Sequence, residues 1–392
     1  MNICRKEKAM IKILELFGGI GALTKAFKRL GIPHRVVDYV EIDKYAVASY
    51  NAMNGTDFKP QDICEWDKDF KDIDLIMHGS PCQDFSLAGK QAGGDKDSGT
   101  RSSLMYETIR IVGKLKPKYI IWENVKNLLS KKHIHNFNAY LETMEQLGYT
   151  NYYQVLNAKD YGIPQNRERV FVVSILGNET FEFPQTQELK LKLKDMLEED
   201  VDEKYYLSDE VVKKYIPNKK NNNTNVVGNL VMEKWQESMK RIYDINKYSP
   251  AINTMQGGNL EPKILLRSKC KRLKKIVTST YFEKGKGLNL DLYNQTTNED
   301  ISQCLTEPHH NSQRLFDGLR IRKLTPKECW RLMGFNDEDF EKAAKVNSNT
   351  QLYKQAGNSI VVPILEAILT NLLLNNEQTQ VENQTTIYDL AS

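Results

Sequence analysis

Short apolar runs alternate with helically spaced segments in the first 180 residues. Apolar residues with helical spacing follow the first run over 23–30, and again over 104–115, just before Pro117. Gly31 is a plausible end for the earlier helix. Strands that alternate with helices are typical of a parallel sheet with crossover helices, so we expect an α/β domain. The predicted strands are 11–17, 36–40, 74–77, 119–122 and 170–175.

The periodic pattern weakens after about residue 180 and returns near residue 320. The intervening sequence contains a charged stretch, 190–202, and a polar stretch rich in Asn, 219–225. Regular spacing resumes at Thr325-Pro-Lys-Glu328, a capping-box pattern with Pro at the first helical position. A last apolar face follows in 360–368, and the remaining tail is polar. We expect a core domain over 1–180, an inserted domain over 181–320, a return to the core over 321–375, and a loose tail over 376–392.

Composition narrows the class of protein only a little. The 392 residues are 40% hydrophobic and 27% charged, which is ordinary for a folded soluble domain. A net charge of +4 permits a polyanionic partner without demanding one. No run approaches the ~18 apolar residues of a membrane span, so we expect a cytoplasmic protein. The six cysteines lack Cys-x-x-Cys spacing and the six histidines form no cluster, so neither a metal site nor a disulfide framework is expected.

A glycine-rich turn, Phe17-Gly-Gly19-Ile-Gly21, lies between the first predicted strand and helix. Glycines let a backbone approach a ligand, and a helix start offers free amide donors. Glu41 ends the second strand, where an acidic side chain can accept both ribose hydroxyls. Asp62 and Ile63 follow at a place suited to an adenine edge. The turn lacks Gly-x-Gly-x-x-Gly, which favours an adenosine without phosphates, although a tight turn without ligand is the alternative.

Cys82 follows directly on the strand at 74–77, in Gly79-Ser-Pro81-Cys82. The carboxyl end of a central strand is the ligand edge of an open α/β sheet. The residues 84–103 then form a loop with four glycines, a length typical of an active-site lid. The alternative is a structural cysteine beside a disordered loop.

Two further motifs fall near the same predicted edge. Glu123 ends a strand in Trp-Glu-Asn-Val, where burial raises a carboxyl pKa as a proton donor requires. Arg167 and Arg169, in Gln165-Asn-Arg-Glu-Arg, open a late strand, and Arg lowers a thiol pKa or binds a carbonyl oxygen. Either motif alone is more often structural, but together they describe a nucleophile, an acid and an anion clamp.

These motifs, in this order and with a late Gly357-Asn-Ser359, resemble the bacterial DNA cytosine-5 methyltransferase family. The resemblance covers about 11–177 and 320–370. It implies a Rossmann-like methyltransferase sheet with S-adenosylmethionine as the cofactor, and an inserted smaller target-recognition domain. Cys82 matches the nucleophile that adds to cytosine carbon 6, Glu123 the residue that holds ring nitrogen 3 and the exocyclic amine, and Arg167 and Arg169 the supporting arginines. The implied cofactor residues are Phe17, Gly19, Gly21, Glu41, Ile42, Asp62, Ile63, Pro81, Leu104, Asn358 and Ser359.

The implied partner is double-stranded DNA, with the target base flipped out of the helix at a cost of roughly a few kcal/mol. Residues 263–286 carry nine Lys or Arg and one Glu, which suits phosphate contacts, although a solvated basic face is the alternative. We expect a monomer, with a cognate restriction endonuclease as a candidate partner. The recognition sequence cannot be read. The expected DNA contacts are Ser86, Lys90, Gln165, Arg267, Lys269, Lys271 and Arg272.

Four rival interpretations are disfavoured at this stage. An amino-methylating DNA enzyme would need an Asp/Asn-Pro-Pro-aromatic motif, which is absent from this sequence. Methylation of tRNA cytosine by the same chemistry needs no large inserted domain, whereas this chain has about 140 residues there. A DNA-binding homologue that has lost catalysis should show damage at Cys82, Glu123 or the arginines, and none is visible. A nicotinamide oxidoreductase lacks the third glycine of its fingerprint and has no use for Cys82.

Overall fold

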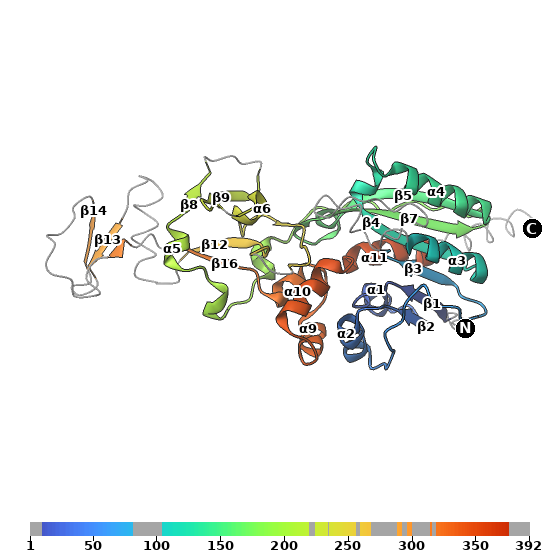
Figure 1. The fold of residues 1–392 in the computed structure, drawn as a ribbon. Helices are drawn as coiled ribbons and strands as arrows, with labels where there is room; N and C mark the ends of the chain where they lie inside the picture. Colours follow the sequence, from blue (N-terminus) through green and yellow to red (C-terminus); the bar gives the residue numbers. More distant parts are fainter. Residues whose placement is uncertain are drawn as a thin grey trace, which may run out of the picture. The chain divides into compact units, whose positions relative to one another are not determined.

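In a computed structural model the chain folds into two compact units (Figure 1). The first unit comprises residues 1–196, 248–260 and 326–392, and the second comprises 197–247 and 261–325. Within them the structure describes residues 10–80, 104–218, 224–233, 235–255, 259–267, 288–291, 296–299, 314–315 and 319–375.

The first unit contains a six-stranded sheet in the order β2-β1-β3-β4-β7-β5. The strands β1 to β4 are mutually parallel, and β7 runs antiparallel to both β4 and β5. A separate short parallel pair joins β11 to β6. The strands are β1 (Ile11–Leu16), β2 (His34–Val40), β3 (Leu75–His78), β4 (Tyr119–Val125), β5 (Tyr149–Asn157), β6 (Gln165–Asn166), β7 (Glu168–Leu176) and β11 (Ser249–Pro250).

Helices cover both faces of this sheet. α3 and α4 share one hydrophobic cluster with the strands, to which Leu14, Ile76 and Trp122 contribute. Side chains alternate along a strand, so Glu15 points to the opposite face, where it contacts α1. α1 lies beside α11, which comes from the far end of the sequence (Figure 1). The helices are α1 (Ala22–Leu30), α2 (Lys44–Asn54), α3 (Met105–Leu115), α4 (Ile134–Gln146), α8 (Pro326–Arg331), α9 (Asp337–Ala344), α10 (Asn349–Asn358) and α11 (Val362–Leu369).

Short helical turns complete the first unit: η2 (Lys126–Leu129), η3 (Ala158–Tyr161), η4 (Leu193–Met196) and a π-helical turn, η6 (Thr370–Asn375). The stretch Asn349–Leu374 has the length and apolar composition of a membrane span. Since 56% of its most apolar window is buried within the protein, we assign it to the core.

The second unit has a five-stranded sheet in the order β16-β12-β10-β9-β8 around a small core of Leu230, Ile242 and Ile321. A three-stranded sheet, β14-β13-β15, belongs to the same unit. The elements are η5 (Glu203–Tyr205), α5 (Asp209–Val212), β8 (Tyr215–Pro217), β9 (Val226–Leu230), α6 (Glu237–Lys240), β10 (Arg241–Tyr243), β12 (Lys263–Arg267), β13 (Leu288–Asp291), β14 (Thr296–Glu299), β15 (Arg314–Leu315) and β16 (Leu319–Lys323).

The α/β class expected from the sequence is confirmed, and all five predicted strands are present within a few residues. The compact units divide at positions other than those expected, 180 and 320. Residues 181–196 belong to the first unit, and so does 248–260, in the middle of the expected insertion. Patterning did not reveal that segment because its attachment to the first unit depends on side chains distant in sequence, described below.

Candidate active site

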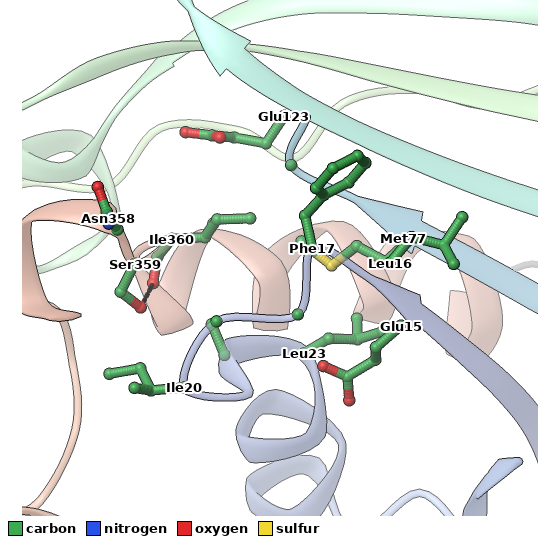
Figure 2. A pocket seen from close by; sticks show the side chains of 14 residues that line it. Glu15, Leu16, Phe17, Ile20, Leu23, Met77, Glu123, Asn358, Ser359 and Ile360 are labelled. Atoms are coloured by element: carbon green, nitrogen blue, oxygen red, sulfur yellow. Dashed lines mark hydrogen bonds between the residues drawn. The ribbon is translucent and has the colours of Figure 1, made fainter. Parts of the chain in front are cut away.

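One pocket opens where β1, β3 and β4 end and where α10 meets α11 (Figure 2). It encloses about 440 Å³ of space not filled by protein, part of it open to solvent. Phe17 and Glu123 lie on one side, and Asn358 and Ser359 lie across from them. Segments more than 300 residues apart in sequence therefore form a single cavity. Its lining residues are Glu15, Leu16, Phe17, Gly18, Gly19, Ile20, Ala22, Leu23, Met77, Gly79, Glu123, Asn358, Ser359 and Ile360.

The glycine turn is held from below by two stacked tyrosines. The rings of Tyr39 and Tyr50 are 4.0 Å apart, and the Tyr39 hydroxyl donates to the Gly19 carbonyl at 2.5 Å. A Cβ on Gly18 would lie 2.5 Å from the Tyr39 ring, and one on Gly21 would lie 2.6 Å from the Tyr50 ring. Gly21 also has a φ of 78°, which favours glycine. These glycines are therefore required by packing within the protein as well as by any ligand.

Glu41 follows β2 and holds the same turn. Its carboxylate accepts from the Gly19 amide at 3.0 Å and from the Asp43 amide at 2.8 Å. Burial raises the pKa of Glu41, and these two backbone hydrogen bonds oppose the shift. Each carboxylate oxygen retains a second lone pair, so Glu41 can accept a ligand hydroxyl without losing its bonds to the turn.

A second carboxyl, Glu15, lies beneath the turn and is only 2% exposed. It accepts a short hydrogen bond from Thr24, whose hydroxyl also lies 3.1 Å from the Tyr50 hydroxyl. Burial raises the pKa of Glu15 to about 7, with the Thr24 hydrogen bond acting against the shift. Glu15 is thus poised to change charge near neutrality, in the lining of the pocket.

Glu123 and Arg169 form an ion pair, with 3.1 Å between Arg Nε and the carboxylate oxygen. Their side chains are 12% and 19% exposed, respectively. Burial raises the pKa of Glu123, while the charges of Arg169 and Arg167 lower it. The arrangement holds a carboxyl in the pocket in a fixed orientation, with an elevated proton affinity.

Arg167 and Gln165 are turned inward. The Arg167 guanidinium donates to main-chain carbonyls of Ile252, Gly357 and Ser359, and its side chain is almost fully buried. The Gln165 amide donates to the Leu332 carbonyl and accepts from the Ile252 amide, and the residue is wholly buried. Gln165 is therefore not available to DNA in this structure, contrary to the sequence expectation.

Ser80, the last residue described before the predicted nucleophile, is anchored to β4. Its hydroxyl accepts from the Trp122 indole at 3.1 Å, and its carbonyl accepts from the Asn124 amide at 3.4 Å. The residue is 4% exposed. The start of the Cys82 segment is thereby fixed to the strand that carries Glu123. Pro81, Cys82, Ser86 and Lys90 themselves lie outside the described residues.

Of the other predicted cofactor residues that the structure describes, Ile42, Asp62, Ile63 and Leu104 are not among those that line this pocket. Ile42 is 67% exposed, whereas Ile63 is 4% exposed. Asp62 accepts from the Cys64 amide, and Leu104 precedes α3 and packs on the core. Arg267 ends β12, but nothing is described of its side chain, and Lys269, Lys271 and Arg272 lie outside the described residues.

Sequence reasoning missed several residues at this site. Glu15 and Ile360 line the pocket, and Lys354 pairs with Asp43 at 2.7 Å beside Glu41. A carboxylate between the buried Leu14 and Leu16 is a signal that could have drawn attention to Glu15. No pattern in the sequence indicated Ile252.

The charge of the pocket restricts its ligand. Glu15 and Glu123 are in the lining, and none of the described lining residues is basic. Among these described residues a phosphate-bearing nucleotide would meet no positive side chain, whereas a nucleoside with a positive charge would be attracted. Among the described residues, no group of three or more His, Cys, Asp or Glu is arranged to hold a metal.

Comparison of the sequence with known proteins identifies the family of this chain. A family model described as C-5 cytosine-specific DNA methylase matches residues 11–373. The type II methyltransferase M2.ScrFI of Lactococcus lactis subsp. cremoris is 34% identical, over 93% of this chain and 99% of that protein. The orphan methyltransferase M.SPBetaI of Bacillus phage SPbeta is 32% identical, over 93% and 97%.

Two solved structures have a similar fold. The S. pombe Dnmt2 methyltransferase has a TM-score of 0.60 at 18% identity, covering 93% of this chain and 98% of that one. The Entamoeba histolytica methyltransferase EhMeth has a TM-score of 0.62 at 15% identity, with the same coverage. At these identities the similarity concerns the fold.

Proposed function

Since the chain belongs to the C-5 cytosine-specific DNA methylase family, we propose that the cofactor and the target cytosine share the pocket between Phe17 and Glu123. The chain is a DNA cytosine-5 methyltransferase with S-adenosylmethionine as its methyl donor. The observation that carries the assignment of the site is that Glu123 and the glycine turn line one cavity.

We assign the cofactor to the glycine-turn side of the pocket. Glu41 accepts the ribose hydroxyls, and the amides of the turn and the wall at Asn358 and Ser359 enclose the nucleoside. Asp62 and Ile63 border the adenine, with Ile42, Pro81 and Leu104 beside them. The acidic lining suits a ligand with a sulfonium charge and no phosphate. When bound, the cofactor supplies the electrophilic methyl group.

We assign the nucleophile to Cys82. Its thiolate adds to carbon 6 of cytosine, which makes carbon 5 nucleophilic enough to take the methyl group. Loss of the proton at carbon 5 and elimination of the thiolate then restore the aromatic ring. The Ser80 contacts hold the start of this segment next to Glu123.

Glu123 binds ring nitrogen 3 and the exocyclic amine, and it carries the proton that neutralises charge developing on the ring. Its raised pKa suits this role. Arg169 orients the carboxyl and limits how far that pKa rises. Arg167 is assigned to positioning, because its guanidinium is directed at three main-chain carbonyls.

We further propose that the target base is flipped out of duplex DNA, since chemistry at carbons 5 and 6 requires access to the face of the ring. The second unit is the proposed target-recognition domain. The basic residues of 263–286, including Arg267, Lys269, Lys271 and Arg272, are assigned to phosphate contacts, and Ser86 and Lys90 to the loop that closes on DNA.

The test is transfer of labelled methyl from S-adenosylmethionine to genomic DNA and to tRNA, by wild type, Cys82→Ala and Glu123→Gln. Wild type should produce 5-methylcytosine in DNA. Cys82→Ala should abolish transfer, and Glu123→Gln should lower it by about a hundredfold or more, as expected for loss of a general acid. Label in tRNA alone would instead support the tRNA reading. No transfer by a wild type that still binds cofactor would indicate an inactive DNA-binding protein.

The cellular setting is also a proposal. We propose a monomeric cytoplasmic enzyme, and a restriction endonuclease partner on the strength of the relatives named type II. Sequencing the methylated DNA would give the target site. An endonuclease encoded with the protein should then fail to cut that site once it is methylated. The relatives named orphan define the alternative, in which no such nuclease exists.

A further inference from the structure

Residues 248–260 form a segment of the first unit whose two neighbours in sequence belong to the second unit. We call it the crossing segment. It begins with β11, which pairs with β6, and the Ser249 amide donates to the Pro164 carbonyl at 2.8 Å. The chain thus leaves the second unit at residue 247, is fixed to the first unit, and re-enters the second unit at residue 261.

Two buried side chains of the arginine motif hold this segment at Ile252. The Ile252 amide donates to Gln165 Oε1 at 3.0 Å, and the Ile252 carbonyl accepts from Arg167 Nη1 at 2.7 Å. Both side chains are at most 3% exposed. Hydrogen bonds to a charged group are the stronger kind, and buried ones are protected from competing water.

The same guanidinium also holds the wall of the cofactor pocket. Arg167 Nη2 donates to the Gly357 carbonyl at 3.0 Å and to the Ser359 carbonyl at 2.9 Å. These carbonyls flank Asn358, and Asn358 and Ser359 line the pocket. One side chain therefore joins the crossing segment to the pocket wall.

Backbone packing brings the two parts together as well. A Cβ on Gly357 would lie 2.2 Å from the Asn253 carbonyl oxygen, a distance that no side chain tolerates. The crossing segment thus lies directly against the end of α10, and movement of either part must be felt by the other.

We propose that Gln165 and Arg167 are positioning residues that couple DNA binding to cofactor binding through the crossing segment. The proposal rests on the assignment of the second unit as the DNA-recognition domain. DNA bound to that unit favours particular positions of both ends of the segment. The hydrogen bonds of Gln165 and Arg167 to Ile252 transmit this preference to the pocket wall. By thermodynamic linkage, bound cofactor strengthens DNA binding by the same factor.

The test measures the dissociation constant of S-adenosylhomocysteine with and without saturating sheared genomic DNA of the kind that the wild type methylates. The ratio of the two constants is the coupling factor, and for the wild type we expect at least tenfold. Gln165→Met removes the hydrogen bonds of the side-chain amide without adding charge and leaves the Arg167 contacts to the wall. It should bring the factor below about threefold, while binding without DNA stays within about threefold of wild type.

Arg167→Lys is the second variant, because one ammonium cannot span three carbonyls in the fixed geometry of a guanidinium. It should weaken S-adenosylhomocysteine binding without DNA as well as reduce the coupling. The matched control is Glu168→Gln, since Glu168 is exposed between the two arginines and forms an ion pair with Lys126 at 2.9 Å. The control should keep the wild-type factor.

A wild-type factor near one, or variants that fold and keep the wild-type factor, would overturn the proposal. Hydrogen exchange of the wild type alone gives an independent measurement if a variant fails to fold. S-adenosylhomocysteine should slow amide exchange in residues 249–255 severalfold, and unchanged exchange there would contradict the coupling. Failure of the proposed function is distinguishable, because it appears as absent DNA methylation by the wild type.

Discussion

Replacing the buried Glu15 by glutamine should change the pH dependence of stability by an amount that the structure sets. Burial raises the pKa of the Glu15 carboxyl from its ordinary value of 4.5 to about 7 in the folded protein. Below pH 4.5 it is protonated in both states and its burial costs no ionisation energy. Above that pH the unfolded chain ionises first, so stability falls until the pH passes the folded pKa. The full loss of folding stability is about 3 kcal/mol, because the two pKa values differ by about 2.5 and each pKa unit corresponds to about 1.36 kcal/mol.

Glutamine stays neutral at every pH. As the pH rises from 5 to 8, the free energy of unfolding of Glu15→Gln should therefore increase by about 2 to 3 kcal/mol relative to that of the wild type. Urea denaturation followed by tryptophan fluorescence measures this, because Trp66, Trp122 and Trp330 all belong to the first unit. The exposed Glu65 provides the control Glu65→Gln, which removes one charge without touching the buried network. If the stability difference between wild type and Glu15→Gln is the same at both pH values, the buried carboxyl does not titrate as argued.

Three further outcomes are expected. Gly18→Ala should weaken S-adenosylmethionine binding at least tenfold and lower the melting temperature, because the added Cβ would lie 2.5 Å from the buried Tyr39 ring. Calorimetry measures the binding and thermal denaturation the melting temperature, and unchanged binding would exclude the clash. Ser80→Ala should lower the free energy of unfolding by about 1–2 kcal/mol, since the buried Trp122 indole loses its acceptor. In a double-mutant cycle, adding Ser80→Ala to Trp122→Phe should lower the free energy of unfolding by almost nothing more. Full additivity of the two substitutions would count against the hydrogen bond. The affinity for S-adenosylmethionine relative to S-adenosylhomocysteine, which lacks the sulfonium charge, should rise severalfold from pH 6 to pH 8, because burial raises the pKa of Glu15 to about 7 and the carboxyl ionises over this range. A ratio independent of pH in titrations with both ligands would contradict this.

The strand ends were the most predictable part of the site. Phe17 and Glu123 could be placed from sequence because short apolar runs mark buried parallel strands, and such strands end at one edge of the sheet. Glu41 was found for the same reason, at the end of the second run. Its bond to the Gly19 amide could not be foreseen, because that contact depends on the conformation of the turn.

The arginine motif shows where this reasoning stops. Its spacing indicated that Gln165, Arg167 and Arg169 matter, but not which way each side chain points. Arg169 lies within β7 and pairs with Glu123. Arg167 precedes β7, and its guanidinium donates to the main-chain carbonyls of residues 252, 357 and 359. Alternation along one continuous strand would put both side chains on the same face. The difference therefore comes from the short break between β6 and β7, which a motif does not record.

The chain order of the pocket has a consequence for folding. Phe17 and Ser359 face one cavity, and the whole second unit is inserted between them in sequence. The pocket wall at residues 357–359 is held by Arg167, which also fixes the crossing segment. The last wall of the pocket is therefore completed against a segment that both precedes and follows parts of the second unit. Under the proposed assignment of the cofactor to this pocket, we expect that a misfolded second unit displaces the segment and weakens cofactor binding before any contact with DNA is made.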